Sequence, residues 1–182
     1  MNHIHIETER LLLRPFKRGD AAAASHNSKQ PTVAHFMSDM VLETQKAASK
    51  WIRWINKEKF NTEIPCVVLA VTLKSSQKCI GLIGLAPKRE LDNEIEILFE
   101  IADAYQNRGY ITESGKALLA WGFANTPAAY FVAIVKLDNP ASVRVIEKLG
   151  FAYSGERRIE YDGTTTDFHY YRIEKEEWRE HH

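Results

Sequence analysis

Three apolar runs rich in β-branched residues occupy the middle of the chain and limit its fold more than any other feature. They extend from Pro65 to Leu73, from Cys79 to Ala86 and from Glu94 to Ile101. Two short polar breaks, residues 74–78 and 87–93, separate them. Connections this short join antiparallel neighbours, because a parallel crossover needs a dozen or more residues. The pattern therefore predicts an antiparallel meander within one sheet.

The segments on both sides of this meander alternate between helical and strand patterns. Before it, we expect a strand at residues 10–16, a helix from about Ala21 that Pro31 ends, and an amphipathic helix at residues 42–60. After it, we expect in order a helix at 108–124, a strand at 130–137, a helix at 140–149, and strands at 152–161 and 164–173 joined by Asp162-Gly163. The order strand, helix, strand predicts a parallel crossover, so the fold class is mixed α/β.

Length and charge limit the domain organisation and the partners. The 182 residues, 45% of them hydrophobic, suit one domain, which we place at residues 1–180; His181 and His182 are candidate remnants of a purification tag. Lys plus Arg and Asp plus Glu each total 24, so we expect no nucleic-acid partner. No apolar stretch is long enough for a membrane span, and we expect a cytoplasmic protein. The two cysteines lack the C-x-x-C spacing of a zinc site, and we expect no metal.

The loop before the expected helix at 108–124 is the first candidate site. A helix start offers unsatisfied N–H donors and the positive end of a dipole, and both suit a pyrophosphate. Gly109 would let a phosphate oxygen approach the backbone, and Arg108 adds a positive charge. On spacing alone, a single glycine before a helix is more often an ordinary turn. A mononucleotide-binding domain is a further alternative, but the chain has neither a G-x-G-x-x-G nor a Walker loop.

Two motifs resemble those of GNAT-type N-acetyltransferases. Gln106-x-x-Gly109 fits the start of the acetyl-CoA motif Q/R-x-x-G-x-G/A, although Ile111 stands where the family has Gly or Ala. The segments 138–142 (DNPAS) and 147–151 (EKLGF) are similar to the family's E-N-x-x-S and E-K-L-G-F. The beginning and end of the chain also look like this family, in particular the branch that contains ribosomal-protein alanine and serine N-acetyltransferases.

The resemblance implies a fold and a co-substrate. The fold would be a GNAT-like, mostly antiparallel central sheet that opens at a β-bulge and has helices on both faces. Acetyl-CoA would lie in this opening and transfer its acetyl group to a primary amine, in first place a protein or peptide N-terminal α-amino group. A second copy of the chain is a further candidate partner. The residues that would hold acetyl-CoA are Phe99, Glu100, Ile101, Gln106, Asn107, Arg108, Gly109, Tyr110, Ile111, Thr112, Asn139 and Ser142.

The acceptor amine must lose a proton before it attacks, and a carboxylate suits that task. Strand alternation places Glu96 and Glu100 on one face of the run 94–101, while Glu160 matches a position where the family branch can place an acidic residue. We predict Glu160 and Glu100 as candidate bases and Ser142 as the group that hydrogen-bonds or protonates the departing CoA sulfur. Each glutamate could equally be a solvated or ion-paired strand residue, and Asn139 and Ser142 could serve only to cap a helix.

Two other functions stay open. The acceptor could be a polyamine, an aminoglycoside or another small amine, because acidic residues suit a cation as well as they suit a base. Alternatively, the chain could be a non-catalytic acyl-CoA sensor, an interpretation that the departure from the motif at Ile111 leaves open.

Overall fold

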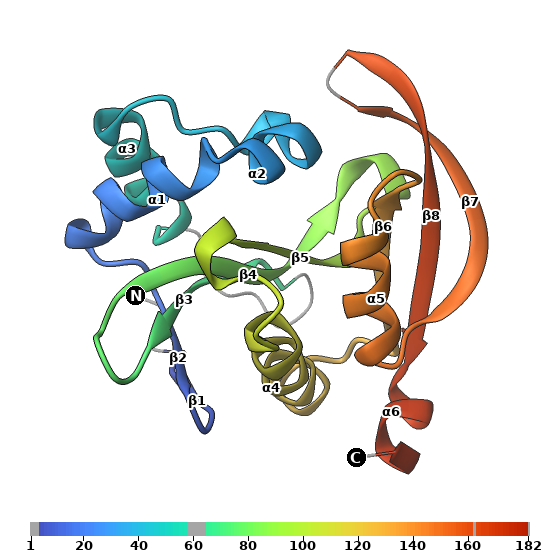
Figure 1. Cartoon of the computed structure of the whole chain (residues 1–182). Coiled ribbons are helices and arrows are strands. Elements are labelled where there is room, and N and C mark those ends of the chain that lie inside the picture. Colours follow the sequence, from blue (N-terminus) through green and yellow to red (C-terminus); the bar gives the residue numbers. More distant parts are fainter. Residues whose placement is uncertain (1–3, 58–64, 162, 182) are drawn as a thin grey trace.

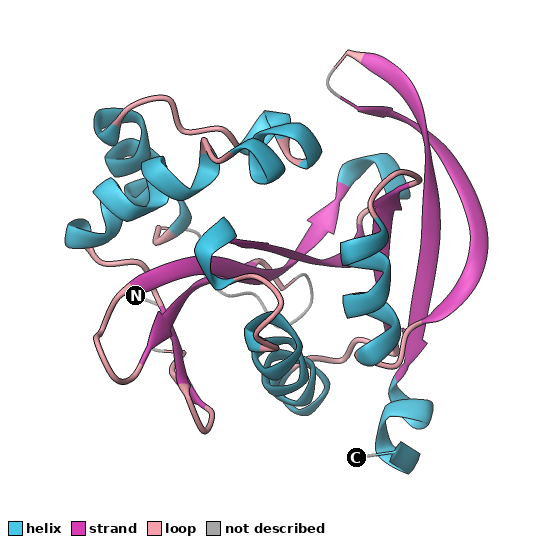
Figure 2. Ribbon diagram, in the orientation of Figure 1, coloured by secondary structure: helices cyan, strands magenta, loops and turns pink. Residues whose placement is uncertain are grey.

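The computed structural model describes residues 4–57, 65–161 and 163–181 and shows a sheet of eight strands with helices on both faces (Figures 1 and 2). The strand order is β1-β2-β3-β4-β5-β6-β8-β7. The strands are β1 (Ile6–Glu7), β2 (Leu11–Arg14), β3 (Val67–Leu73), β4 (Cys79–Lys88), β5 (Glu94–Ile101), β6 (Tyr130–Lys136), β7 (Ala152–Tyr161) and β8 (Thr164–Glu174). The mixed α/β fold predicted from the sequence is confirmed.

In the described part of the chain, five α-helices and four short 3-10 turns lie between the strands, and a sixth helix follows the last strand. The helices are α1 (Ala21–Ser28), α2 (Pro31–Phe36), α3 (Gln45–Ile55), α4 (Tyr110–Asn125), α5 (Pro140–Lys148) and α6 (Lys175–His181). The 3-10 turns are η1 (Arg18–Asp20), η2 (Ser38–Met40), η3 (Arg89–Leu91) and η4 (Asp103–Tyr105). Helices α1, α2 and α3 lie on one face of the sheet, and α4 and α5 lie on the other (Figure 1). None of the described helices is long and apolar enough to cross a bilayer.

Each face of the sheet has its own hydrophobic core. On the α4 face, Leu85 and Ile97 from the sheet pack with Leu118 and Leu149 from the helices. On the α1 face, a second cluster joins the helices to alternate strand residues, among them Leu82 and, partly buried, Leu98. The predicted meander is confirmed, since β3, β4 and β5 pair antiparallel in sequence order. Because strand side chains alternate between the faces, Glu96 and Glu100 share the α1 face with Leu98.

The sheet opens between β5 and β6, the one parallel pair of neighbours among the described strands. Glu96 and Val132 form the register pair recorded between these strands, and the strands diverge beyond it (Figure 1). The β4–β5 register is regular from Gly81↔Ile101 to Lys88↔Glu94. The recorded register shifts lie elsewhere, between Val71 and Thr72 and between Tyr153 and Glu156. The opening between β5 and β6 therefore does not coincide with a shift in the β4–β5 register.

Several boundaries differ from those expected. Pro31 does not only end a helix, because it is also the first residue of α2, where its missing N–H costs no hydrogen bond. Helix α3 begins later than expected, at the cap made by the Thr44 hydroxyl, which accepts a hydrogen bond from Ala47 N–H. The short elements β1 and α6 were not predicted. Residues 58–60 of the expected helix, Asp162 of the hairpin and His182 lie outside the described residues.

Candidate active site

A cleft of about 440 Å³ occupies the opening between β5 and β6. Its walls come from β5, β6, the start of α4, helix α5, and the segment of α2 and η2. Most of the residues predicted from the sequence to hold a cofactor line it: Phe99, Glu100, Ile101, Gln106, Asn107, Gly109, Tyr110, Ile111, Thr112, Asn139 and Ser142. The fold thus brings together two motifs that lie about thirty residues apart in the sequence.

The loop between β5 and α4 turns sharply to present the helix start. Asn107 and Gly109 both adopt left-handed backbone conformations, with φ of 58° and 77°. Gly109 is the N-cap of α4, and because glycine has no side chain, no side-chain group caps the helix. The N–H groups of the first helical turn have no intrahelical acceptor, so the helix dipole and these donors together favour an anion. The Gln106 side chain braces the loop by donating a hydrogen bond of 2.9 Å to Asp103 Oδ1.

Ile111 does not disturb this helix start, although it is larger than the Gly or Ala typical of the motif. Its side chain is buried, with 6% exposure. The first backbone bond of α4, from Glu113 N–H to the Gly109 carbonyl, measures 2.9 Å, as in an ordinary helix. The bulk of Ile111 therefore packs against protein and leaves the first-turn N–H groups in place.

Helix α5 forms the wall opposite the β5–α4 loop. The Asn139 side chain caps it, since Oδ1 accepts a hydrogen bond of 3.1 Å from Ser142 N–H, and Pro140 follows at the first helical position. This contact engages Asn139 in helix capping. Ser142 lines the cleft, and its hydroxyl makes no hydrogen bond to the described residues, so it can donate one to a bound molecule.

Two carboxyl groups on β5 are perturbed by their surroundings. Burial raises the pKa of Glu100 to about 7; its side chain is 6% exposed, and Oε2 has no hydrogen-bond partner among the described residues. Burial also raises the pKa of Glu96 to about 7, where Lys88 opposes the shift and the nearby acidic residues Glu90 and Asp39 add to it. Both groups line the cleft, and both are poised to exchange a proton near neutral pH.

Two of the residues predicted from the sequence are not brought into the cleft lining. Glu160 is exposed on β7, where it pairs with Thr165 of β8. Arg108 is exposed beside the loop, with its guanidinium carbon 5.6 Å from the centre of the Tyr105 ring. The position of Glu160 depends on the curvature of the β7–β8 hairpin, which strand alternation alone does not determine.

Sequence reasoning missed the wall made by α2 and η2. It is apolar at Val33, Phe36, Met37 and Met40, and it carries the carboxylate of Asp39. Two contacts join this wall to the end of β6 and to the loop that follows it. Lys136 Nζ donates to the His35 carbonyl at 3.1 Å, and His35 Nε2 lies 3.3 Å from Asp138 Oδ2. Pro31 as a helix start was the one available sequence signal for this segment.

The sequence of the chain matches a known family model and known proteins. The sequence model of the acetyltransferase (GNAT) domain matches residues 10–152. YnaD, an uncharacterized N-acetyltransferase of Bacillus subtilis (strain 168), is 28% identical over 177 residues, which cover 96% of this chain and 99% of that protein.

Solved structures share the fold. An acetyltransferase of the GNAT family from Bacillus anthracis superposes with a TM-score of 0.78 at 26% identity, covering 95% of this chain and 99% of that one. A ribosomal-protein-S5-alanine acetyltransferase from Vibrio fischeri superposes with a TM-score of 0.75 at 17% identity, covering 96% and 98%. The family match over most of the chain, together with the opened sheet and its cleft, shows that this protein belongs to the GNAT family of acetyltransferases, which use acetyl-CoA as co-substrate.

Proposed function

We propose that the protein binds acetyl-CoA in the cleft between β5 and β6 and transfers the acetyl group to a protein or peptide N-terminal α-amino group. The observation that carries this proposal is the joint placement, in one cleft, of a helix start with free N–H donors and two carboxyl groups whose pKa values are raised to about 7. The first feature suits the phosphates of the co-substrate, and the second suits removal of a proton from an amine.

The residues present fit acetyl-CoA. The left-handed conformation of Gly109 leaves space beside the backbone that a Cβ would reduce, and the N–H groups of residues 107–112 would hold the pyrophosphate. Backbone groups of Phe99 to Ile101 face an opened strand edge that an extended pantetheine chain can occupy. When bound, acetyl-CoA supplies an acetyl thioester as the acyl donor.

Glu96 is the base that the geometry favours, with Glu100 second to it. Glu96 lies at the point where β5 and β6 still pair, whereas Glu100 lies four residues further toward the phosphate-binding loop. At about 3.3 Å per residue, roughly 13 Å separate the two along the strand, so only one can be close to the reacting carbon. We place that carbon near the last paired position, because the extended arm runs from the loop toward it. There Glu96 accepts the proton of the amine, directly or through a water molecule.

Ser142 and the backbone complete the proposed mechanism. The Ser142 hydroxyl, which makes no hydrogen bond to the described residues, donates a hydrogen bond to the departing sulfur, which leaves as a thiolate and takes its proton from solvent. Backbone N–H groups at the divergence of β5 and β6 stabilise the negative charge that develops on the carbonyl oxygen. Neither role requires a covalent intermediate with the enzyme, so the amine attacks the thioester directly.

The match of pKa values supports an α-amino acceptor. An α-amino group has a pKa of ~8, which is close to the pKa of about 7 for Glu96. A lysine side chain has a pKa of ~10.4, so its ammonium group gives up a proton to Glu96 less readily. The ribosomal-protein-S5-alanine acetyltransferase among the structural neighbours is consistent with this preference. A small polyamine is the second candidate, because Asp39, Glu96 and Glu100 place three carboxyl groups along the same cleft.

A thiol-release assay with a panel of acceptors tests the proposal. We expect turnover with peptides that carry a free N-terminal Ala or Ser, and none with the same peptides after N-terminal blocking. Internal lysines in the blocked peptides serve as a matched control for side-chain amines. Turnover confined to spermidine or an aminoglycoside would contradict the N-terminal proposal, and acetyl-CoA binding without turnover on any amine would favour a sensor.

A further inference from the structure

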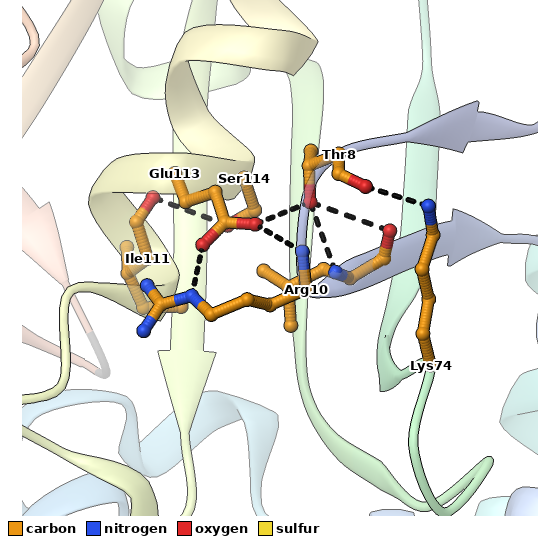
Figure 3. A network of polar contacts seen from close by, with 7 residues as sticks. Thr8, Arg10, Lys74, Ile111, Glu113 and Ser114 are labelled. Carbon is orange, nitrogen blue, oxygen red and sulfur yellow. Dashed lines mark hydrogen bonds and ion pairs between the residues drawn. The ribbon is translucent and has the colours of Figure 1, made fainter.

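A network of polar contacts joins the N-terminal hairpin to the first turn of α4 (Figure 3). The Glu113 carboxylate is its centre. It accepts a hydrogen bond of 2.5 Å from the Thr8 hydroxyl and two from Arg10, of 2.9 Å from the backbone N–H and 2.6 Å from Nε. Lys74 Nζ in turn donates to the Thr8 carbonyl at 2.6 Å. The backbone and the inner edge of the Arg10 side chain are thereby fixed relative to α4.

The outer edge of the same guanidinium remains available. Its terminal nitrogens make no hydrogen bond or ion pair to the described residues, because Glu113 engages only Nε. The guanidinium carbon lies 4.5 Å from the centre of the Tyr110 ring, so stacking further limits its motion. One terminal nitrogen lies 3.5 Å from the position that a Cβ at Gly109 would occupy. Four N–H bonds are thus held beside the turn that begins α4.

The charge of Glu113 would affect an anion bound at the start of α4, and this makes the position of Arg10 important. Although burial acts in the opposite direction, the hydrogen bonds from Thr8 and Arg10 lower the pKa of Glu113, so the carboxylate is ionised at neutral pH. An uncompensated negative charge in the first turn of α4 would repel a phosphate bound at the same helix start. Arg10 neutralises it and leaves its own outer donors directed toward the Gly109 turn.

We propose that Arg10 is a phosphate-binding residue of the acyl-CoA site, an inference that rests on the proposed function. Its terminal nitrogens bind a phosphate of the 3′-phospho-ADP portion of the co-substrate, next to the N–H groups of the β5–α4 loop. Glu113 and Thr8 position it for this contact. A guanidinium suits the task because its planar array of donors binds two phosphate oxygens at once.

Calorimetric titration of the full chain with CoA tests the inference. Arg10→Met should weaken CoA binding about tenfold, the size expected for loss of a charge-assisted hydrogen-bonding pair at a partly exposed site. Arg53→Met is the matched control: it makes the same change in an exposed arginine on α3, at the other face of the sheet, and should leave binding within about twofold of wild type. Arg10→Lys keeps the charge without the planar donors and should fall between wild type and Arg10→Met.

A double-mutant cycle with Glu113→Gln separates direct contact from simple neutralisation. Glu113→Gln alone should bind CoA as tightly as wild type or more tightly, because it removes a negative charge near the phosphates. If Arg10 touches a phosphate, Arg10→Met should still weaken binding several-fold in the Glu113→Gln background. If Arg10 only neutralises Glu113, the second change will have no effect there, and the inference will be overturned.

Titration with 3′-dephospho-CoA identifies the phosphate. A loss of the same size with CoA and with dephospho-CoA assigns the contact to the pyrophosphate, and a loss seen only with CoA assigns it to the 3′-phosphate; both outcomes support Arg10 as a phosphate ligand. Equal affinities of Arg10→Met and Arg53→Met for both compounds would contradict the inference alone. Failure of the wild-type protein to bind CoA would contradict the proposed function, and the inference with it.

Discussion

Replacing Glu96 by Gln should lower the activity of the protein and raise its stability above neutral pH, because the same carboxyl group affects both properties. The change removes the proposed base but keeps the size of the side chain and its ability to accept a hydrogen bond. We expect kcat for thiol release to fall by ~10²-fold or more, within the usual range for loss of a general base. The affinity for acetyl-CoA should stay within about twofold of wild type, since Glu96 lies at the far end of the cleft from the phosphate-binding loop.

The pH dependence of the rate follows from the raised pKa. Only the ionised carboxylate can accept a proton, and the pKa of Glu96 is about 7. The wild-type rate should therefore fall about tenfold for each pH unit below 7 and level off above it. Glu96→Gln should lack this limb, whereas Glu160→Gln, which changes an exposed residue outside the cleft lining, should retain it.

The substitution Glu96→Gln should raise the free energy of unfolding above neutral pH, although it lowers the rate. Because folding raises the pKa of Glu96 from 4.5 to about 7, the native state is favoured fully below pH ~4.5 and loses this contribution as the pH rises through about 7. This rise in pKa corresponds to on the order of 3 kcal/mol of folding free energy, because each tenfold change in proton affinity is worth about 1.4 kcal/mol. Contact of the half-buried carboxylate with solvent reduces this contribution. Glu96→Gln should thus be about 1–3 kcal/mol more stable than wild type at pH 8 and close to it at pH 4.5.

Urea denaturation at both pH values, together with thiol release between pH 5 and 9, measures these effects. A stable but inactive variant at pH 8 would show that the lost rate is not lost folding. Unchanged kcat with the acidic limb intact would refute Glu96 as the base. If Glu100→Gln produced the loss instead, the reacting carbon would lie nearer the loop than we propose.

The structure supports three other predictions. Gly109→Glu should abolish measurable acetyl-CoA binding in calorimetry. The backbone at φ 77° disfavours any side chain, and a glutamate adds a negative charge beside the phosphates. Unchanged affinity would show that the loop does not bind the co-substrate. Ser142→Ala should lower kcat with little change in the affinity for acetyl-CoA, because the hydrogen bond from the backbone N–H of residue 142 to Asn139 is retained. A wild-type rate would show that the Ser142 hydroxyl does not assist the departure of the sulfur. Gly122→Ala should destabilise the protein by about 1–3 kcal/mol in urea denaturation, because its Cβ would lie 2.6 Å from Leu85 Cδ1 and 2.9 Å from Phe131 Cζ; equal stability would mean that these side chains can move away.

Local patterns in the sequence predicted the central part of the fold. The apolar runs and short breaks between residues 65 and 101 imply the meander, and the following helix and strand imply the parallel crossover. Asn139 caps its helix in the structure as predicted, and Pro140 follows at the first helical position. These predictions succeeded because each depends on residues that are close together in the chain.

The features that long-range packing determines could not be predicted in this way. The raised pKa of Glu96 depends first on burial of its carboxyl group by the folded chain, and to a smaller extent on Glu90 and Asp39, which come from other segments and which no periodicity connects to β5. Helix α2 reaches the cleft only because the N-terminal segment folds across the sheet. The position of Arg10 beside Gly109 likewise joins residues about a hundred positions apart. Glu160 illustrates the converse, since a plausible sequence position does not bring its side chain to the cleft lining.

A crystal structure of the protein with CoA tests the central proposal most directly. We predict that the pantetheine chain lies between β5 and β6, that the phosphates contact the loop at Gly109, and that the sulfur lies closer to Glu96 than to Glu100. CoA bound outside this cleft, or a sulfur directed away from Glu96, would contradict the proposed site.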